Sequence, residues 1–143
     1  MGADARYCQR QYLKELDRRF DRGFDPGRSI AAEPREFRAP AGVFLVARLR
    51  GDPIGCGGLK LRERAPAEVK RMWVAPAARG LGVGARLTEL EARAAAGGGS
   101  IVRLETNRAL AEAIAMYRSR GYREVAPFSD DAYADHWFEK RLG

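Results

Sequence analysis

The sequence predicts one α/β domain over residues 1–143, with a mixed, mostly antiparallel twisted sheet flanked by helices. Three short runs rich in branched and aromatic residues follow one another between residues 43 and 74 and are separated by turn residues, as in an antiparallel meander. Apolar residues recur at helical spacing in segments 6–22, 84–96 and 109–120. Further strands are expected beside the last two of these helices, so the sheet should be mixed.

The N-terminal part contains one helix followed by a loop. Residues 6–22 place Tyr12 and Leu16 on one side at helical spacing, opposite a charged face. Residues 23–27, with the sequence GFDPG, end this helix with turn chemistry. Residues 28–42 are polar and interrupted by prolines, so we expect a loop or a short helix there.

A meander of three strands follows. We expect its strands at residues 43–48, 54–61 and 68–74, with a tight turn at residues 50–53 between the first two. Several glycines in the second strand indicate a β-bulge or the close approach of another backbone.

Helices and strands alternate in the C-terminal half. We expect a helix at residues 84–96, a strand at 101–105, a helix at 109–120, and strands at 122–125 and 136–142. Gly121 is expected to be the C-cap of the last helix.

Composition narrows the classes of function. With 143 residues, 45% of them hydrophobic, the chain can bury the core of one domain. It has no run of 18 apolar residues and no apolar leader, so we expect a cytoplasmic protein without a membrane span. Cys8 and Cys56 lack metal or redox spacing, which is typical of a reducing compartment. A single histidine argues against most metal sites, and no metal is predicted.

The net charge of +7 raises the question of a nucleic-acid partner. The basic residues are spread along the chain, and no run of them is longer than a pair. This distribution favours a modest attraction to polyanions over a dedicated DNA-binding surface.

Residues 68–86, with the sequence EVKRMWVAPAARGLGVGAR, join a strand, a glycine-rich turn and the start of a helix. Glycines let the backbone approach an anion closely, and the first turn of a helix presents unsatisfied N–H groups to it. Arg79 and Arg86 flank the turn and can add charge-assisted contacts. This stretch therefore predicts a phosphate-binding site.

The turn R-G-x-G-x-G after a strand, followed by Asn107, Tyr117 and the pair Gly121-Tyr122, resembles the acyl-CoA-binding motifs of the GCN5-related N-acetyltransferase (GNAT) superfamily. The resemblance extends from about residue 43 to the terminal strand HWFEKRL. It implies a GNAT fold and direct transfer of an acetyl group from acetyl-CoA, the acyl-donor substrate, to a primary amine. The segment around residues 12–26 is similar to a bacterial subgroup, some of whose members follow a MarR-type DNA-binding domain in one polypeptide.

The resemblance also implies which residues bind acetyl-CoA. The turn would hold the CoA pyrophosphate through Arg79, Gly80, Leu81, Gly82, Val83, Gly84, Ala85 and Arg86. Backbone groups of Met72, Trp73 and Val74 would contact the pantetheine arm and the thioester carbonyl. Asn107 matches a position that hydrogen-bonds the cofactor arm, and an N-cap of the following helix is the alternative.

Acetyl transfer to an amine requires removal of the ammonium proton, donors for the oxyanion and an acid for the departing thiolate. The ammonium proton must be removed because a primary ammonium has a pKa of about 10 and is therefore charged at neutral pH. Tyr117 matches the family tyrosine that protonates the CoA sulfur. Core packing on the apolar face of its helix is the alternative explanation.

The base is less clearly assigned by the resemblance. Glu68 matches a carboxylate that acts through water in some histone-type members, and a strand residue paired with Lys70 is the alternative. Strand alternation predicts that Glu68, Lys70, Met72 and Val74 share one face. Glu105 and His136 are further candidates for the base, and for each of them a purely structural role is the alternative.

Two other functions fit parts of the pattern. Gly80, Gly82 and Ala85 also match a dinucleotide fingerprint, with Glu105 as the ribose-binding acid. Two observations oppose a dinucleotide-binding function. The glycines do not follow the strand directly, and the strand carries charged residues. A non-catalytic acyl-CoA-binding regulatory module is the remaining alternative. The acceptor is expected to be a small-molecule or peptide amine, for which residues 28–42 would be a specificity element, and a homodimer follows by analogy.

Overall fold

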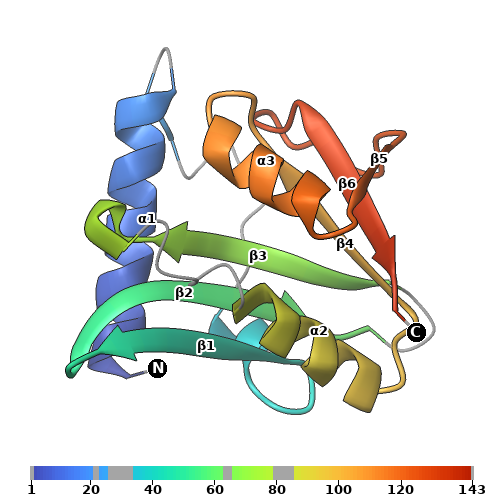
Figure 1. The fold of residues 1–143 in the computed structure, drawn as a ribbon, viewed down its shortest axis with the longest axis horizontal. Helices are drawn as coiled ribbons and strands as arrows, with labels where there is room; N and C mark the ends of the chain where they lie inside the picture. Colours follow the sequence, from blue (N-terminus) through green and yellow to red (C-terminus); the bar gives the residue numbers. More distant parts are fainter. Residues whose placement is uncertain (1, 21–22, 26–33, 63–65, 79–85, 143) are drawn as a thin grey trace.

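The computed structural model describes residues 2–20, 23–25, 34–62, 66–78 and 86–142, and it confirms the α/β fold (Figure 1). Each helix and strand predicted from the sequence has a counterpart, with boundaries shifted by a few residues. In chain order, the elements are α1 (Ala3–Arg19), the 3-10 helix η2 (Pro34–Phe37), β1 (Gly42–Leu49), β2 (Asp52–Lys60), β3 (Ala67–Val74), the 3-10 helix η3 (Pro76–Ala78), α2 (Arg86–Ala96), β4 (Ile101–Thr106), α3 (Ala111–Ser119), β5 (Arg123–Val125) and β6 (His136–Arg141).

The six strands form one sheet in the order β1-β2-β3-β4-β6-β5. Neighbouring strands are antiparallel except for β3 and β4, which run parallel and pair at only two positions, Ala67 with Val102 and Glu68 with Arg103. In Figure 1 these two strands meet near the C-terminus and diverge toward α1. The sheet is therefore two antiparallel units joined by a short parallel contact.

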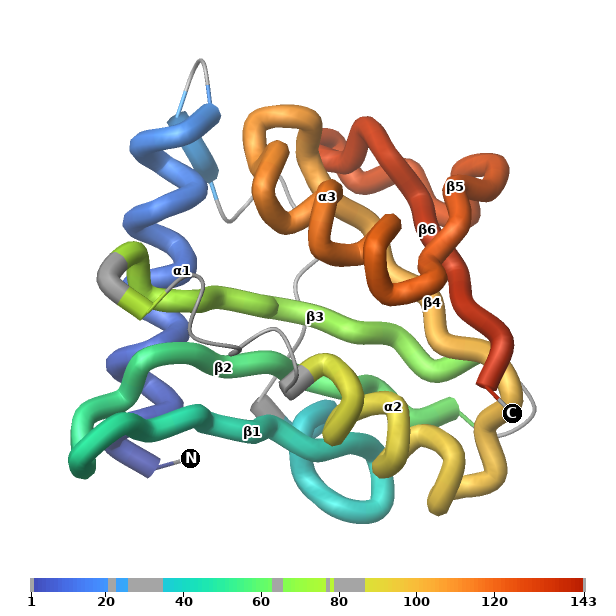
Figure 2. The backbone as a smooth tube through the Cα atoms, in the orientation of Figure 1, coloured from blue at the N-terminus to red at the C-terminus, as the bar shows by residue number. Residues whose placement is uncertain are grey.

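The helices cover both faces of this sheet (Figure 2). Residues of α2 and α3 pack with the central strands in the larger hydrophobic core, which includes Leu59, Val69, Leu87, Leu90, Val102, Tyr117 and Phe138. On the opposite face, α1 lies across β1, β2 and β3, where its Cys8 packs against Cys56 and Trp73. Within the described ranges, no helix is long and apolar enough to cross a membrane.

A β-bulge at Arg71 interrupts β3. The pairing with β2 changes register between Cys56 and Gly58, and Arg71 has a left-handed backbone φ of 56°. The thiol of Cys56 donates a hydrogen bond to the carbonyl oxygen of Arg71 at 3.3 Å, which helps to hold this shape. The extra residue reverses the orientation of every side chain that follows it in the strand.

The bulge makes the predicted alternation along β3 wrong. Glu68 and Lys70 share one face, but Met72 packs in the same core as Val69, three positions before it. Trp73 packs on the α1 face instead. An uninterrupted strand would place residues three apart on opposite faces, so the bulge is the physical reason for the error.

The glycine pair of β2 is explained by side chains that approach it. A Cβ atom added to Gly57 would collide with the sulfur of Met72, and one added to Gly58 would collide with the ring of Phe37. The bulge predicted for β2 is confirmed at Ile54, next to Gly55, where the pairing with β1 changes register between Ala47 and Arg48. The close neighbours at Gly57 and Gly58 are side chains and not another backbone.

The end of α3 brings two tyrosines together. The C-cap of α3 is Arg120, so the prediction of Gly121 as the C-cap is wrong by one position. Gly121 follows the C-cap with a φ of 91°, and the backbone N–H of Tyr122 donates to the carbonyl of Tyr117 at 3.0 Å. This is the hydrogen bond of a Schellman motif. It places the two rings in an edge-on contact with centroids 5.8 Å apart.

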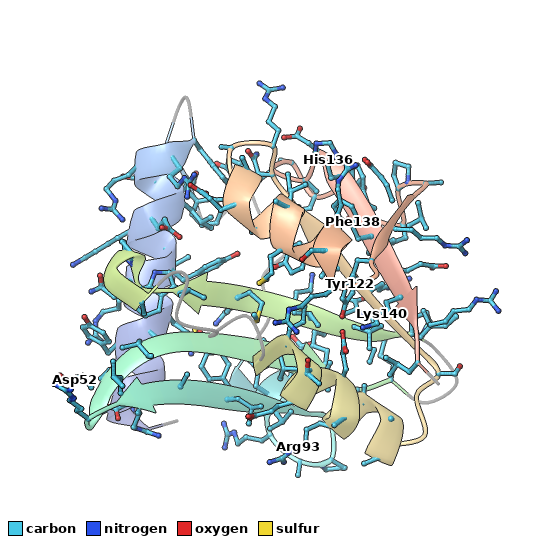
Figure 3. The ribbon with its side chains drawn as sticks, in the orientation of Figure 1. Asp52, Arg93, Tyr122, His136, Phe138 and Lys140 are labelled. Atoms are coloured by element: carbon cyan, nitrogen blue, oxygen red, sulfur yellow. The ribbon has the colours of Figure 1, made fainter. Side chains whose placement is uncertain are left out.

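An ionic contact attaches α2 to β6. The carboxylate of Glu91 on α2 accepts hydrogen bonds from the hydroxyl of Tyr122 at 2.8 Å and from Nζ of Lys140 at 3.1 Å. Figure 3 shows Tyr122 and Lys140 beside each other. Because Glu91 is buried, this pairing satisfies a charge that would otherwise destabilise the core.

The two leucines Leu90 and Leu49 provide a test of the core. Leu90 is 1% exposed between α2 and the sheet, whereas Leu49 is 47% exposed at the end of β1. We expect Leu90→Ala to lower the free energy of unfolding by about 2–5 kcal/mol, because it leaves a cavity. Leu49→Ala should change it by less than about 0.5 kcal/mol. Urea denaturation measures both, and equal effects would contradict this placement of α2.

Candidate active site

A cavity of about 210 Å³ is lined by residues of both β3 and β4. Residues Val69 to Met72 of β3 and Leu104 to Thr106 of β4 line it from the sheet, together with Asn107. The remaining lining comes from α1 and from Phe20 and Phe24 after it, from Leu110, Ala113 and Tyr117 around α3, and from Asp131, Tyr133 and Ala134 between β5 and β6. Segments distant in the sequence therefore meet at one concave site.

The edge of β3 that faces this opening has no strand beside it beyond Glu68, among the strands that the structure describes. Met72, Trp73 and Val74, predicted from the resemblance to contact the pantetheine arm, lie on this segment. Trp73 and Val74 line a second cavity of about 260 Å³, and Met72 lines both cavities. Backbone N–H and C=O groups that lack a strand partner can bind an extended ligand as an added strand would.

Tyr117 is part of the core and of the cavity wall. It is 5% exposed, and its ring packs against Tyr122 and Phe138. Burial raises the pKa of its hydroxyl, and the nearby Tyr12 adds to the shift. Core packing, one of the two explanations offered by the sequence, is therefore confirmed; the side chain also borders the cavity, and its role as the acid stays a prediction. A phenol with a raised pKa stays protonated at neutral pH, as a proton donor must.

Tyr12 of α1 lines the same cavity, and its proximity to charged groups was not anticipated from the sequence. Burial raises the pKa of its hydroxyl to about 12, Arg71 opposes this, and Asp131 and Glu105 add to it. Helical spacing identified Tyr12 only as a residue on the buried face of α1. No local signal indicates that this face meets residues about a hundred positions later.

Glu105 at the end of β4 brings a carboxylate to the cavity. Its Oε1 accepts a hydrogen bond from Nζ of Lys70 at 3.1 Å, and its Oε2 accepts one from the hydroxyl of Ser129. The indole N–H of Trp137 in turn donates to Ser129 Oγ at 3.1 Å. The carboxylate is thus held in a fixed orientation from three elements of the chain.

Glu68 lies at the point where β3 and β4 stop pairing, outside the residues that line the cavity. It is 6% exposed, and its Oε1 accepts a hydrogen bond from Nη2 of its strand partner Arg103 at 2.6 Å. Arg62 and Lys70 lie 3.2 Å and 3.6 Å from the carboxylate. Burial by itself would raise the pKa of Glu68, but Arg103, Lys70 and Arg62 together hold it below its usual range.

Asn107 lines the cavity and shapes the entry to α3. Its Oδ1 accepts a hydrogen bond from the backbone N–H of Ala109 at 2.8 Å, and its Nδ2 donates to the carbonyl of Tyr133 at 2.8 Å. The N-cap of α3 is Leu110, so the N-cap alternative for Asn107 is wrong. The side chain instead closes a turn just before the helix, which an Asn favours at such a position.

Other predicted residues lie elsewhere. Residues 79–85 of the glycine-rich turn are outside the described residues, and Arg86 is the first residue of α2. His136 pairs with Glu124 at 2.7 Å and stacks on Phe138, and it does not line the cavity. In the described part of the chain, no three His, Cys, Asp or Glu side chains form a group that could hold a metal ion.

Comparison with known families accounts for this architecture. The profile of the family described as the Acetyltransferase (GNAT) domain matches residues 40–124. The chain belongs to the GNAT family. It is 38% identical over 120 residues to the "IAA acetyltransferase" of Azospirillum brasilense, a match that covers 82% of this chain and 78% of the relative.

Two further proteins are similar to this GNAT chain. It is 35% identical over 126 residues to the "N-alpha-acetyltransferase RimI" of Mycobacterium tuberculosis, covering 86% of this chain and 75% of that one. A GNAT-family acetyltransferase structure from Staphylococcus aureus Mu50 superposes with a TM-score of 0.83 at 17% identity, covering 100% of this chain and 96% of the other. This GNAT protein is an acetyl-CoA-dependent N-acetyltransferase, as the sequence predicted.

The Glu68 carboxylate gives a test of the acid stability of this site. Because its pKa is lower in the folded chain than in the unfolded chain, its contribution is complete above the ordinary value of 4.5 and is lost as pH falls through the folded-state pKa. We expect Glu68→Gln to lower the free energy of unfolding at pH 7 by about 2 kcal/mol, with a smaller further loss between pH 5 and pH 3 than in the wild type.

Urea denaturation across this pH range measures the effect. Glu112→Gln is the control, because Glu112 pairs with Arg19 at the surface with its side chain 64% exposed. Parallel curves of unfolding free energy against pH for the wild type and Glu68→Gln would show that the ion pair with Arg103 does not stabilise the fold.

Proposed function

We propose that this acetyltransferase moves the acetyl group directly from acetyl-CoA to a primary amine bound in the cavity between α1, α3 and the diverging strands. One observation carries the proposal: Tyr117 and Glu105 line the same cavity, beside the edge of β3 that β4 leaves unpaired. In this arrangement a proton donor and a proton acceptor lie on either side of the space where the two substrates would meet.

The proposed reaction has three linked parts. The amine nitrogen attacks the thioester carbonyl carbon, and a C–N bond forms as the C–S bond breaks. The thiolate takes a proton from the hydroxyl of Tyr117. Before the attack, the ammonium gives one proton through a water molecule to Glu105. After the C–N bond has formed, the nitrogen loses a second proton, which replaces the one that Tyr117 gave to the thiolate. The place of Tyr117 in the cavity wall, with its hydroxyl protonated at neutral pH, supports its role as the acid.

Glu105 is preferred to Glu68 as the proton acceptor because of where each carboxylate lies. Glu105 borders the cavity, whereas Glu68 is buried at the strand junction and bonded to Arg103. A lowered pKa also makes Glu68 a weaker base. The catalytic role predicted for Glu68 thus stays a hypothesis, and the comparison of the two variants below decides it.

The donor-binding residues complete the proposal. Backbone groups of Met72, Trp73 and Val74 would contact the pantetheine arm, residues 79–86 would hold the pyrophosphate, and Asn107 would contact the arm from the opposite side. The edge of β3 that β4 leaves unpaired supports the contact of these backbone groups with the pantetheine arm. The glycine-rich sequence of residues 79–86 supports their role in holding the pyrophosphate.

The acceptor and the assembly state are further parts of the proposal. The Mycobacterium tuberculosis relative is called an N-alpha-acetyltransferase, which keeps a peptide amine beside small-molecule amines as an acceptor. Kinship with acetyltransferases fused to MarR-type domains, a homodimer and a cytoplasmic location also remain proposals. The two free cysteines support the cytoplasmic location. Light scattering of the purified chain tests the homodimer.

Replacement of Tyr117 tests the acid. We expect Tyr117→Phe to lower kcat on the order of 100-fold while the affinity for acetyl-CoA stays within about twofold, because the ring still packs but no longer donates a proton. Steady-state release of CoA gives the first quantity, and calorimetric titration with acetyl-CoA gives the second.

Tyr122→Phe is the matched control, since Tyr122 is also buried and its ring contacts that of Tyr117. It should lower stability through the loss of its bond to Glu91 and leave turnover nearly unchanged. Acetyl-CoA binding without any acetyl transfer by the wild type would favour the regulatory module. Unchanged turnover in Tyr117→Phe would remove this hydroxyl from the mechanism.

Replacement of the two carboxylates tests the base. We expect Glu105→Gln to lower kcat/KM on the order of 100-fold and to remove the decline of the rate on the acidic side of its pH profile. Glu68→Gln should retain that decline at a temperature where the variant is folded. A pH–rate profile of each variant with a saturating donor measures this, and the reverse result would make Glu68 the base.

A further inference from the structure

The wall of the cavity formed by residues that follow α1 and by the β5–β6 connection is aromatic. Phe20, Phe24 and Tyr133 line it, with the ring of Tyr133 centred 5.4 Å from that of Phe20 and 4.7 Å from that of Phe24. The hydroxyl of Tyr133 accepts a hydrogen bond from the backbone N–H of Asp25 at 2.9 Å, and its carbonyl accepts one from Asn107 at 2.8 Å. These bonds fix the wall in place, so it presents a preformed apolar surface.

A guanidinium group borders the same cavity because of the bulge in β3. Arg71 adopts a left-handed backbone φ of 56°, which is strained for a residue other than glycine. Its side chain lines the cavity, donates a hydrogen bond to Oε1 of Gln9 and lies 5.4 Å from the ring centre of Phe37. The planar group carries five N–H donors in a fork that matches a carboxylate. Arg71 therefore brings a cation to the cavity wall, beside Gln9.

Charges of both signs thus border one small space. Glu105 and Asp131 line the cavity together with Lys70 and Arg71, and Lys70 donates a hydrogen bond to Glu105 at 3.1 Å. Arg71, Glu105 and Asp131 all lie within electrostatic reach of the hydroxyl of Tyr12. The volume of about 210 Å³ is below the roughly 300–1,000 Å³ of sites for drug-sized ligands. The occupant should therefore be small, should carry a positive and a negative group, and should have an apolar remainder.

We propose that the acceptor is a free α-amino acid with an aromatic or large aliphatic side chain. Its carboxylate binds Arg71, its amine faces Glu105, and its side chain packs against Phe20, Phe24 and Tyr133. This inference rests on the proposed function, because it assigns the occupant of the same cavity. Polyamines have no carboxylate for Arg71, and the first residue of a peptide has an amide in that position.

Four amines test this class of acceptor: L-phenylalanine, L-phenylalaninamide, 2-phenylethylamine and spermidine, each with acetyl-CoA as the donor. We expect kcat/KM for L-phenylalanine to exceed that for the amide and the simple amine by on the order of 10- to 100-fold, because both lack the carboxylate. A short peptide with N-terminal phenylalanine is the fifth probe and should behave as the amide does.

Arg71→Gln should bring the ratio between L-phenylalanine and its amide close to one. Arg71→Lys keeps the positive charge but lacks the forked N–H donors of the guanidinium, so it should give an intermediate ratio. This variant replaces Arg71→Gln in the test if Arg71→Gln does not fold. Arg123→Gln is the matched control, because Arg123 lies on β5 with its side chain 69% exposed and pairs only loosely with Glu139 at 3.5 Å. It should keep the wild-type ratio.

The outcomes separate the two levels of the proposal. Equal rates with the acid and the amide, preferred transfer to the peptide or spermidine, or an unchanged ratio in both Arg71 variants would overturn the amino-acid acceptor and leave the acetyltransferase mechanism standing. Binding of acetyl-CoA without transfer to any of the five amines would also overturn the amino-acid acceptor, whereas the mechanism is tested separately by the loss of turnover in Tyr117→Phe.

Discussion

The ion pair between Glu68 and Arg103 lies at the last position where β3 and β4 pair, and the arrangement of the site depends on it. Before this point the two strands share backbone hydrogen bonds; beyond it they separate and leave the cavity between them. Arg62 and Lys70 add positive charge around the same buried carboxylate. A pair held from several sides keeps the junction closed while the strands diverge, and the angle between the strands sets the width of the site.

The bulge in β3 gives this opening its chemistry. By adding one residue, it allows Lys70 and Arg71 to lie beside the cavity while Met72 returns to the core. A regular strand would have alternated these side chains and placed fewer polar groups in the site. Opposite them, β4 contributes Glu105 and α3 contributes Tyr117. The two halves of the sheet thus supply different chemical groups to one cavity.

Sequence patterns were sufficient to predict the fold, because the helical and strand periodicities of this chain are regular and glycines mark most of the turns. They also identified Tyr117 and Glu105 as candidate residues. They failed at Arg71, since the residues K-R-M-W read as an ordinary strand and nothing local signals an extra residue. They also gave no indication of Tyr12 or Tyr133 as site residues, because those contacts join segments more than 100 positions apart, as in the bond between Asp25 and Tyr133.

The connection between β3 and β4 has a consequence for how the chain folds. The meander of β1, β2 and β3 pairs residues that are close in sequence, whereas the bond between Glu68 and Arg103 closes a loop of 35 residues that contains α2. Closing the longer loop loses more chain entropy and brings fewer strand contacts in return. We therefore expect the meander to form early and the strand junction late. The catalytic cavity, which exists only once both halves of the sheet have joined, would be among the last features of the native state to appear.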